Sequence, residues 1–552
     1  MLDTEGESRL RRISQVKGRS KRTKEETLWH TFISQSQTVF GSFCFSKKEE
    51  IKMDAFIQTV TEVNAFINNI VWGWPVIILI LGTGLLLSIR TRFLQVRKFG
   101  NSWASTIIPT LKSIGKKKEK KPGEKTVSQF EAFSAAISGT VGTGNIIGVV
   151  AAILTGGPGA VFWMWISAFF GMVTNYSENV LGLYFRKRDK NGDFSGGAFH
   201  YIEKGLGWKW LGYIAAVFCM LAAIGMSGVQ TNKISGTLSG SLDQAFQFGD
   251  DRLFIVKLVI GIVVAAIAAV IILGGIKRIG KVASMLVPFM SLLFIVMALI
   301  SIFANVDKIG GAFGMIFGNA FNFKAAGGGI FGYAFAQTIK KGMARGVFSN
   351  EAGLGSSVIA HSASETKEPV MQGLWGVFEV FFDTFIICTL TALMMLTTVD
   401  VNVLTGAEGD TAMALSIFSN NFGVFGTVTF SVIMPLFAFT TIMAWSYYGE
   451  KATAFCFQWL GEKGQRISVI AFKVLYVVLI VASAVIESDL LWNISDTANG
   501  LMAIPNLIAL IAMNGLVWKI TKNYYDRKKG IDVKPMLSAY PELNEAFEKE
   551  IE

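Results

Sequence analysis

The sequence predicts an all-α protein that crosses a lipid bilayer many times. Of its 552 residues, 51% are hydrophobic and only 16% are charged, which is more apolar than an ordinary soluble chain. Apolar windows of about 20 residues, long enough to span hydrocarbon, recur along most of the chain. The Lys and Arg residues fall in the short segments between these windows. The net charge of +11 therefore indicates membrane topology and not nucleic-acid binding.

Ten of these windows are clear, and an eleventh, interrupted one is expected at about 335–362. An odd number of spans is needed to keep the basic segments on one side of the membrane. The ten clear windows are 67–89, 130–154, 160–185, 210–229, 253–273, 282–304, 371–396, 422–448, 467–486 and 490–518.

Basic residues concentrate in alternate connecting segments. The segment from Arg90 to Lys125 carries eleven Lys and Arg residues, whereas the segments at 231–252 and 398–422, on the opposite side, carry two and none. The positive-inside rule therefore predicts an N-terminus outside and a cytoplasmic C-terminus. The expected location is the cell membrane, taken as a bacterial plasma membrane, with the chain as a multi-pass protein.

Residues 1–52 do not follow this rule, because they carry eleven basic residues on the side expected to be outside. Their polar composition, without the long apolar core of a signal peptide, favours a disordered extension or a misassigned start, with translation beginning at Met53.

The remaining spans divide into two halves of five when the first span is set aside. An odd number of spans per half forces the two halves into opposite orientations in the membrane. The expected organisation is an extension (1–52), an extra transmembrane helix with a basic cytoplasmic linker (53–127), a first five-helix repeat (128–304), an external loop (305–330), a second five-helix repeat (331–518) and a cytoplasmic tail (519–552).

Two glycine-rich interruptions open the two halves at corresponding places. GTVGTGNIIG stands at 139–148 and FSNEAGLGSS at 348–357. Lipid cannot hydrogen-bond exposed backbone, so non-helical backbone at membrane depth survives only where it is buried in protein or lines a cavity. Paired interruptions of this kind indicate an inverted-repeat transporter with its binding site near the middle of the bilayer.

The first interruption, here called the first break, offers both kinds of backbone group to a ligand. Glycines 139, 142 and 144 allow unwound backbone, whose carbonyls suit a desolvated cation and whose amides suit a carboxylate. Asn145 adds a neutral side-chain oxygen. Small-residue helix packing is the alternative, but it needs neither Asn145 nor Thr143. A dinucleotide-binding motif fits less well, because no strand precedes Gly142.

The second interruption, the second break, places Ser349, Asn350 and Glu351 beside flexible backbone. An extramembrane loop is the alternative here, since Lys340 lies just upstream with further basic residues. A loop here would leave an even number of spans, and the basic segments before and after it would then lie on opposite sides of the membrane. The positive-inside rule therefore disfavours that alternative.

Three carboxylates lie inside apolar windows, namely Glu178, Glu379 and Asp383. Intramembrane carboxylates are costly and are usually functional. Glu379 and Asp383 share one helix face, where they are able to coordinate a cation, to relay a proton, or to pair with a basic residue. The candidate basic residues are Lys340, Lys341 and Arg345.

Two hydroxyl groups and an aromatic ring follow in the window at 422–448. Thr440 and Thr441 offer adjacent hydroxyls, either to a ligand or to their own helix backbone. Trp445 lies one turn after Thr441 on the same face, where it either bounds a small side-chain pocket or anchors the helix at the interface.

No catalytic constellation emerges from the sequence. Glu379, Asp383 and His361 include no nucleophile and base at recognisable spacing, so we expect no enzyme activity. An ion channel remains a less favoured alternative, because channels more often assemble their filter from identical subunits. The lipid bilayer is the one macromolecular environment expected, with no nucleic acid and no obligate protein partner.

Four segments together carry a resemblance to a known family. SGTVGTGNIIGV, GGPGAVFWMW, SGGAFHYIEKGLG and RGVFSNEAGLGSSVIAHSA resemble the alanine or glycine:cation symporter (sodium:alanine symporter) family of the amino acid-polyamine-cation superfamily, from about Met53 to Lys529. The resemblance implies a leucine-transporter-type 5+5 inverted repeat, preceded by one extra transmembrane helix. It also implies import of small neutral amino acids such as alanine and glycine with sodium, by alternating access. Coupling to protons instead of sodium is the alternative.

The resemblance also implies a division of labour between the two breaks. Backbone amides of the first break would bind the substrate carboxylate, carbonyls of the second would receive its ammonium, and an aromatic ring would bound the side-chain pocket. These substrate residues are Gly142, Thr143, Gly144, Phe348, Ser349, Asn350 and Trp445. One sodium ion would lie among Ser138, Val141, Thr440 and Thr441, and a second among Thr140, Asn145 and either Asp383 or Thr384.

Overall fold

The computed structural model describes residues 47–113, 127–189, 192–321, 329–399, 409–486 and 488–551. Residues 66–552 form one compact unit and residues 1–65 another. Among its described residues the first unit holds only the start of helix α2 (Lys47–Val71), so the fold below is that of the second unit. The prediction for residues 1–52 lies mostly outside the described residues, and 47–52 belong to α2.

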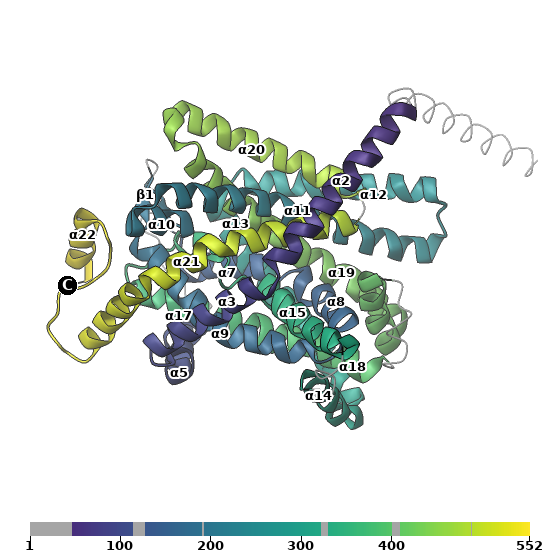
Figure 1. The fold of residues 1–552 in the computed structure, drawn as a ribbon, viewed down its shortest axis with the longest axis horizontal. Coiled ribbons are helices and arrows are strands. Elements are labelled where there is room, and N and C mark those ends of the chain that lie inside the picture. Colours follow the sequence, from purple (N-terminus) through teal and green to yellow (C-terminus); the bar gives the residue numbers. More distant parts are fainter. Residues whose placement is uncertain are drawn as a thin grey trace, which may run out of the picture. The chain divides into compact units, whose positions relative to one another are not determined.

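The second unit is built almost entirely from helices (Figure 1). One short antiparallel hairpin pairs β1 (Lys187–Arg188) with β2 (Phe194–Ser195). In chain order the helices after α2 are α3 (Trp74–Arg90), α4 (Leu94–Arg97), α5 (Phe99–Ser105), α6 (Ile107–Ser113), α7 (Gln129–Thr140), α8 (Ile147–Gly156), α9 (Ala160–Tyr184), α10 (Ala198–Leu206), α11 (Lys209–Phe246), α12 (Asp250–Ile272), α13 (Gly275–Ala304), α14 (Val306–Ala320), α15 (Gly329–Asn350), α16 (Ser357–His361), α17 (Pro369–Val380), α18 (Thr389–Thr398), α19 (Gly409–Cys456), α20 (Gly461–Ser483), α21 (Ser488–Lys528) and α22 (Pro541–Ile551).

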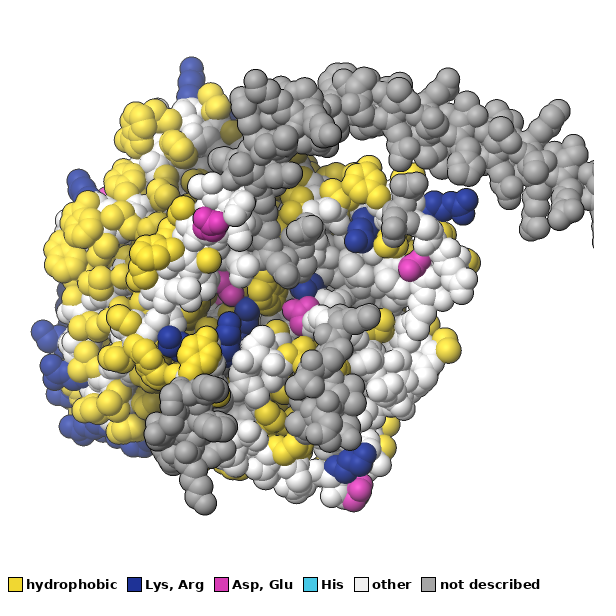
Figure 2. All heavy atoms as spheres, turned by 45° about the vertical axis from the view of Figure 1, so that its right-hand side comes forward, with side chains coloured by type: hydrophobic (Ala, Val, Ile, Leu, Met, Phe, Trp, Pro, Cys, Tyr) yellow, Lys and Arg dark blue, Asp and Glu magenta, His cyan; other side chains and the backbone are white. Residues whose placement is uncertain are grey.

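Eight stretches of the described chain are long and apolar enough to cross a membrane. They coincide with eight predicted windows, so the chain is an all-α, multi-pass membrane protein, as predicted. Large apolar side chains cover much of the face drawn in Figure 2, as lipid contact requires. The eight stretches are Gln58–Arg90, Lys209–Phe246, Arg252–Ile272, Gly275–Ala304, Pro369–Thr398, Gly409–Cys456, Gln458–Ser483 and Leu491–Lys528.

Of the other three predicted windows, two contain the predicted breaks and one forms a continuous helix. Window 130–154 is divided into α7 and α8, with a short 3₁₀ turn at Thr143–Asn145 between them. Window 335–362 is divided into α15 and α16, with residues 351–356 between them outside any helix. Window 160–185 forms the continuous helix α9. Both interruptions are therefore confirmed as breaks in the helices.

Several helices extend beyond the apolar windows. Segment 305–330, predicted to be an external loop, contains α14; α11 runs to Phe246, inside a segment expected to lie outside the spans. Likewise α19 begins at Gly409, and a positive φ of 57° at Gly423 kinks it near the expected start of the span. Hydropathy marks the residues at which side chains become polar. A helix continues past that point as long as its residues do not favour a turn, so the helices are longer than the apolar windows.

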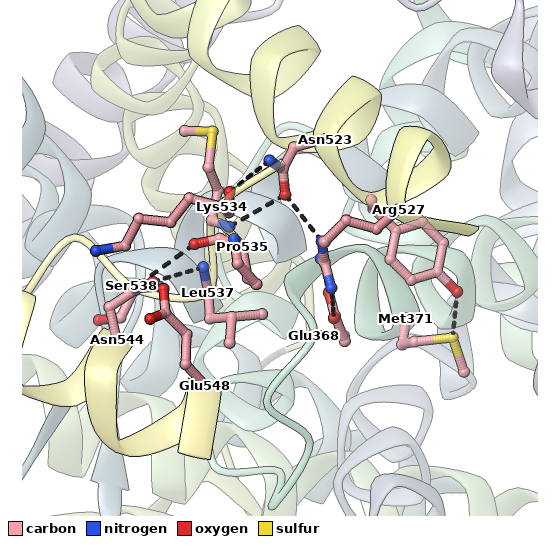
Figure 3. A network of polar contacts seen from close by, with 12 residues as sticks. Glu368, Met371, Asn523, Arg527, Lys534, Pro535, Leu537, Ser538, Asn544 and Glu548 are labelled. Carbon is pink, nitrogen blue, oxygen red and sulfur yellow. Dashed lines mark hydrogen bonds and ion pairs between the residues drawn. The ribbon is translucent and has the colours of Figure 1, made fainter. Parts of the chain in front are cut away.

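The predicted C-terminal tail packs back onto the end of α21 (Figure 3). Arg527 donates two hydrogen bonds to the Glu368 carboxylate, at 2.6 and 2.9 Å. Asn523 donates to the Lys534 carbonyl at 2.8 Å, and Asn544 accepts from the Leu537 amide at 2.8 Å. The segment after the last span is thus held by defined contacts to the α16–α17 connection and to its own helix.

The elements around the two breaks lie side by side. α7 contacts α13, α16 and α19, while the 3₁₀ turn of the first break contacts α15, α19 and the π-helical segment Phe381–Cys388. This packing brings residues more than 200 positions apart into one buried region.

Candidate functional site

The first break turns backbone amides away from their helical partners. In a continuous helix the Gly142 amide would bond the Ser138 carbonyl, but it donates instead to Asn145 Oδ1 at 2.8 Å. The Asn145 amide donates to the Gly142 carbonyl at 3.3 Å and not to that of Val141. The carbonyls of Ser138 and Val141 thereby lose their helical donors, an arrangement that the sodium site implied by the family resemblance would use.

A glutamine from another helix also reaches the first break. The Thr143 amide donates to Gln230 Oε1 on α11, at 3.4 Å, and Gln230 is buried. Two of the three amides assigned to the substrate carboxylate therefore already have side-chain acceptors, those of Gly142 and Thr143. Sequence reasoning missed Gln230, since it lies 87 positions from Thr143 in an ordinary apolar span.

The second break frees carbonyls in the same way. The Ala352 amide donates to Asn350 Oδ1 at 3.1 Å, and the Leu354 amide donates to the Glu351 carbonyl at 3.0 Å. In a continuous helix these amides would bond the carbonyls of Phe348 and Asn350. The C-terminal end of α15 therefore presents carbonyls without their usual amide donors, although Phe348, Ser349 and Asn350 are themselves helical.

Glu178 of α9 holds the second break in shape. Its Oε1 accepts hydrogen bonds from the amides of Gly353 and Gly355, at 3.1 and 3.0 Å, and from Asn506 Nδ2 at 2.5 Å. Gly353 and Gly355 have φ values of 93° and 73°, which favour glycine. One buried carboxylate thus ties the break to α9 and to α21.

Glu351 occupies the centre of the second break in a strained conformation. Its φ is 56°, a region that costs a non-glycine residue about 1–3 kcal/mol and persists where surroundings enforce it. Its carboxylate accepts from Trp445 Nε1 at 2.9 Å and from Ser356 at 2.6 Å. A Cβ added at Gly139 would lie 3.3 Å from Glu351 Oε1, so this carboxylate also reaches the first break.

Asp383 joins the two breaks through one carboxylate. Asn145 Nδ2 of the first break donates to Oδ1 at 2.6 Å, and Ser349 at the end of α15 donates to Oδ2 at 2.9 Å. Thr384 donates to the same Oδ2 at 2.8 Å, and Asn350 donates to Thr384 at 3.1 Å. Asp383 lies in the π-helical segment, and such segments are frequent at functional sites.

Thr441 lies against the first break, whereas Thr440 lies beside Met290 of α13, and both bond their own helix. Both hydroxyls donate to the Phe437 carbonyl, at 2.9 and 3.2 Å. A Cβ added at Gly142 would lie 2.3 Å from Thr441 Oγ1, so a larger residue there would have to displace the Thr441 hydroxyl. Thr441 is therefore both bonded to its own helix and close to the break, whereas Thr440 shows only contacts within its helix and to α13.

One predicted ligand does not join the rest of its group. The Thr140 hydroxyl donates to the Ile137 carbonyl at 3.2 Å, within its own helix. Asn145, Asp383 and Thr384 meet as predicted, but no hydrogen bond between Thr140 and these residues is found in the described chain.

Of the three roles considered for Glu379 and Asp383, pairing with Lys340, Lys341 or Arg345 is not found among the described ion pairs. Glu379 pairs with His361, whose Nε2 lies 2.7 Å from Oε2, and Asp383 bonds the amide and hydroxyl groups above. Arg345 pairs with Asp496 of α21, at 3.0 Å. The spacing of residues along one helix did not show that Glu379 has its partner on α16, or that Arg345 has its partner on α21.

A buried arginine fixes the chain just after the second break. Arg186, in the connection after α9, donates to the carbonyls of Ser362, Ser364 and Thr366. Burial lowers the pKa of Arg186 to about 9, so its guanidinium stays charged at neutral pH. These three carbonyl oxygens compensate the cost of burying the guanidinium charge, because no carboxylate is among its hydrogen-bond partners here.

The chain is similar in sequence to a family of transporters over most of its length. The sequence pattern of the sodium:alanine symporter family matches residues 57–537. The sodium/alanine symporter AgcS of Methanococcus maripaludis is 39% identical over 481 residues, covering 86% of this chain and 98% of that protein. The probable sodium/glutamine symporter GlnT of Bacillus subtilis is 34% identical over 474 residues, covering 86% of this chain and 92% of that protein. The crystal structure of MhsT in complex with L-phenylalanine aligns with a TM-score of 0.49 at 15% identity, over 72% of this chain and 99% of that one.

Proposed function

Because the chain belongs to the sodium:alanine symporter family, a family of transporters and not of enzymes, we propose that it imports small neutral amino acids such as alanine and glycine together with sodium. One observation carries this proposal: the Asp383 carboxylate bonds Asn145 of the first break and Ser349 of the second. A ligand held between the breaks would therefore contact both halves of the molecule, as alternating access requires.

The proposed architecture is a 5+5 inverted repeat after one extra span. The broken helix pairs α7–α8 and α15–α16, together with α9, would cross the membrane beside the eight long apolar stretches, giving eleven spans. The alternation of basic segments supports an N-terminus outside and a C-terminus in the cytoplasm.

The proposed substrate site uses the polar groups that the breaks release. Asn145 Oδ1 and Gln230 Oε1 accept from the amides of Gly142 and Thr143, in the way a substrate carboxylate would. Substrate entry would then exchange these side-chain acceptors for the carboxylate. The carbonyls around Phe348, Ser349 and Asn350 would receive the ammonium group.

The side-chain pocket would be bounded by Trp445. The ring is fully buried and its indole is fixed by the hydrogen bond to Glu351. A fixed aromatic wall favours a short side chain over a long one, which supports alanine or glycine. Glutamine is the second candidate, because the GlnT relative is described as a probable sodium/glutamine symporter.

Two sodium positions are proposed beside the substrate. The first lies among Ser138, Val141, Thr440 and Thr441, where two carbonyls have lost their helical donors and a hydroxyl faces Gly142. The second lies at Asn145, Asp383 and Thr384, where the carboxylate supplies a full negative charge. Oxygen ligands of this kind suit a hard cation, and proton coupling at the same carboxylate is the alternative.

Alanine substitution of one residue at each proposed sodium position should change the sodium dependence of uptake without unfolding the protein. Asn145→Ala and Thr441→Ala each remove an oxygen beside the first break, so both should raise the sodium concentration needed for half-maximal uptake in proteoliposomes. Thr155→Ala is the matched control, because this hydroxyl on α8 also bonds only its own helix and is exposed. An unchanged sodium requirement in both variants would remove them from the site.

A further inference from the structure

A large cavity lies apart from the two breaks. Its volume is about 920 Å³, and its walls come from α6, α7, α13 and α17. None of the residues assigned above to substrate or sodium lines it. A space of this size, lined mainly by apolar groups, suits a molecule far larger than a water or an ion.

Aromatic rings form much of the wall. Phe133 and Trp375 pack with their ring centroids 4.3 Å apart, and Trp103 and Phe378 do so at 5.1 Å. Phe133, Trp375 and Phe378 line the cavity together with further apolar residues of α13. Trp375 is buried and donates to Gln129 Oε1 at 3.4 Å, and Gln129 also lines the cavity, so this hydrogen bond joins the α7 and α17 walls.

The cavity opens on the lipid-facing side of α13. Leu292 lines it and is 64% exposed. Large exposed residues at 285, 289, 296 and 299 continue along α13 with spacings of three or four, so they share one face with Leu292. Because α13 is one of the membrane-spanning stretches, this face contacts hydrocarbon, and so does the mouth of the cavity.

Hydrocarbon at the mouth determines which occupant fits. An acyl chain gains no hydrophobic free energy by moving from lipid into protein, but an unfilled void leaves its lining without contact atoms. Ser291 also lines the cavity, and its hydroxyl has no hydrogen-bond partner among the described residues. Thr106, Ser128, Gln129 and Glu365 make part of the lining polar. In the sequence, Thr106 lies within the basic segment from Arg90 to Lys125, and Ser128 follows it.

We propose that this cavity binds one acyl chain of a glycerophospholipid, drawn from the leaflet that contacts the basic segments. The apolar walls hold the chain, and the polar part of the lining meets the ester region of the lipid. The bound chain lies against α7, the first half of the first broken helix. It therefore braces α7 in the position seen here.

Lipid retention tests the proposal without requiring transport. The purified protein is loaded with phosphatidylglycerol or with phosphatidylethanolamine, washed with detergent, and weighed by native mass spectrometry. The native chain should keep one phospholipid with either headgroup. Ser291→Phe fills the cavity and should lose that lipid, whereas Val296→Phe, one of the lipid-facing positions outside the lining, should keep it.

Three outcomes would overturn the proposal: no lipid retained by the native chain, equal retention in Ser291→Phe, or retention of one headgroup only. Ile295→Phe narrows the same cavity from the next turn of α13, which guards against misfolding of the first variant. Loss of lipid from Ile295→Phe but not from Val296→Phe would again support it. Failure here leaves the transport proposal untouched, since lipid counting measures no uptake.

Discussion

Asp383→Asn should raise the sodium concentration for half-maximal uptake by about ten- to a hundredfold, the equivalent of the roughly 1.5–3 kcal/mol carried by a hydrogen bond to a charged group. The substitution removes the negative charge that would bind the cation. It also replaces one of the two carboxylate oxygens by an NH₂ group, so that either Asn145 or the hydroxyls of Ser349 and Thr384 lose their acceptor. The measurement is radiolabelled alanine uptake into proteoliposomes over a series of sodium concentrations.

Glu379→Gln is the matched control for Asp383→Asn. It makes the same chemical change one turn earlier on the same span, at a carboxylate that bonds His361 and the last residue of the second break, Ser357, and not Asn145 or Ser349. Its sodium requirement should stay near that of the native chain. If both variants shifted the sodium requirement equally, or if neither did, Asp383 would lose its assignment as a cation ligand.

Glu178→Ala should abolish stabilisation of the protein by sodium and alanine. The substitution leaves the amides of Gly353 and Gly355 without their acceptor, at a cost of about 1–3 kcal/mol for each buried group. The second break would then lose the conformation that directs its carbonyls to the ligand. Thermal unfolding with and without the two ligands measures this, because a ligand that binds only the folded state raises its stability.

Two further variants separate the effect on the break from a general loss of stability. Glu178→Gln keeps one side-chain oxygen as an acceptor and should retain part of the ligand-induced shift. Glu542→Ala removes an exposed carboxylate at the start of α22 and should retain all of it. A full shift in Glu178→Ala would contradict the role given to Glu178.

Local sequence features predicted the apolar membrane-spanning stretches and both breaks, but not α14 or the extensions of α11 and α19. Gly142 and Gly144 in an apolar run, and Gly353 and Gly355 in another, are recognisable because few other residues tolerate such backbone in a membrane. The meeting of Asn145 with Asp383 was also foreseen, although only through the family resemblance.

Other parts of the site depend on contacts between distant helices. The pairing of Glu351 with Trp445 spans 94 positions, and that of Glu178 with Asn506 spans 328. Such contacts depend on how helices pack, which hydrophobic periodicity leaves open. For the same reason the sequence left three roles open for Glu379 and Asp383 and did not show that Glu379 bonds His361.

The central claim is that sodium drives the import of a small amino acid through the site between the breaks. The most direct test is alanine uptake by the purified protein in proteoliposomes with an inward sodium gradient. We predict accumulation above the external concentration, collapsing when a sodium ionophore dissipates the gradient and remaining low when potassium replaces sodium. Uptake that is indifferent to the sodium gradient would contradict the account.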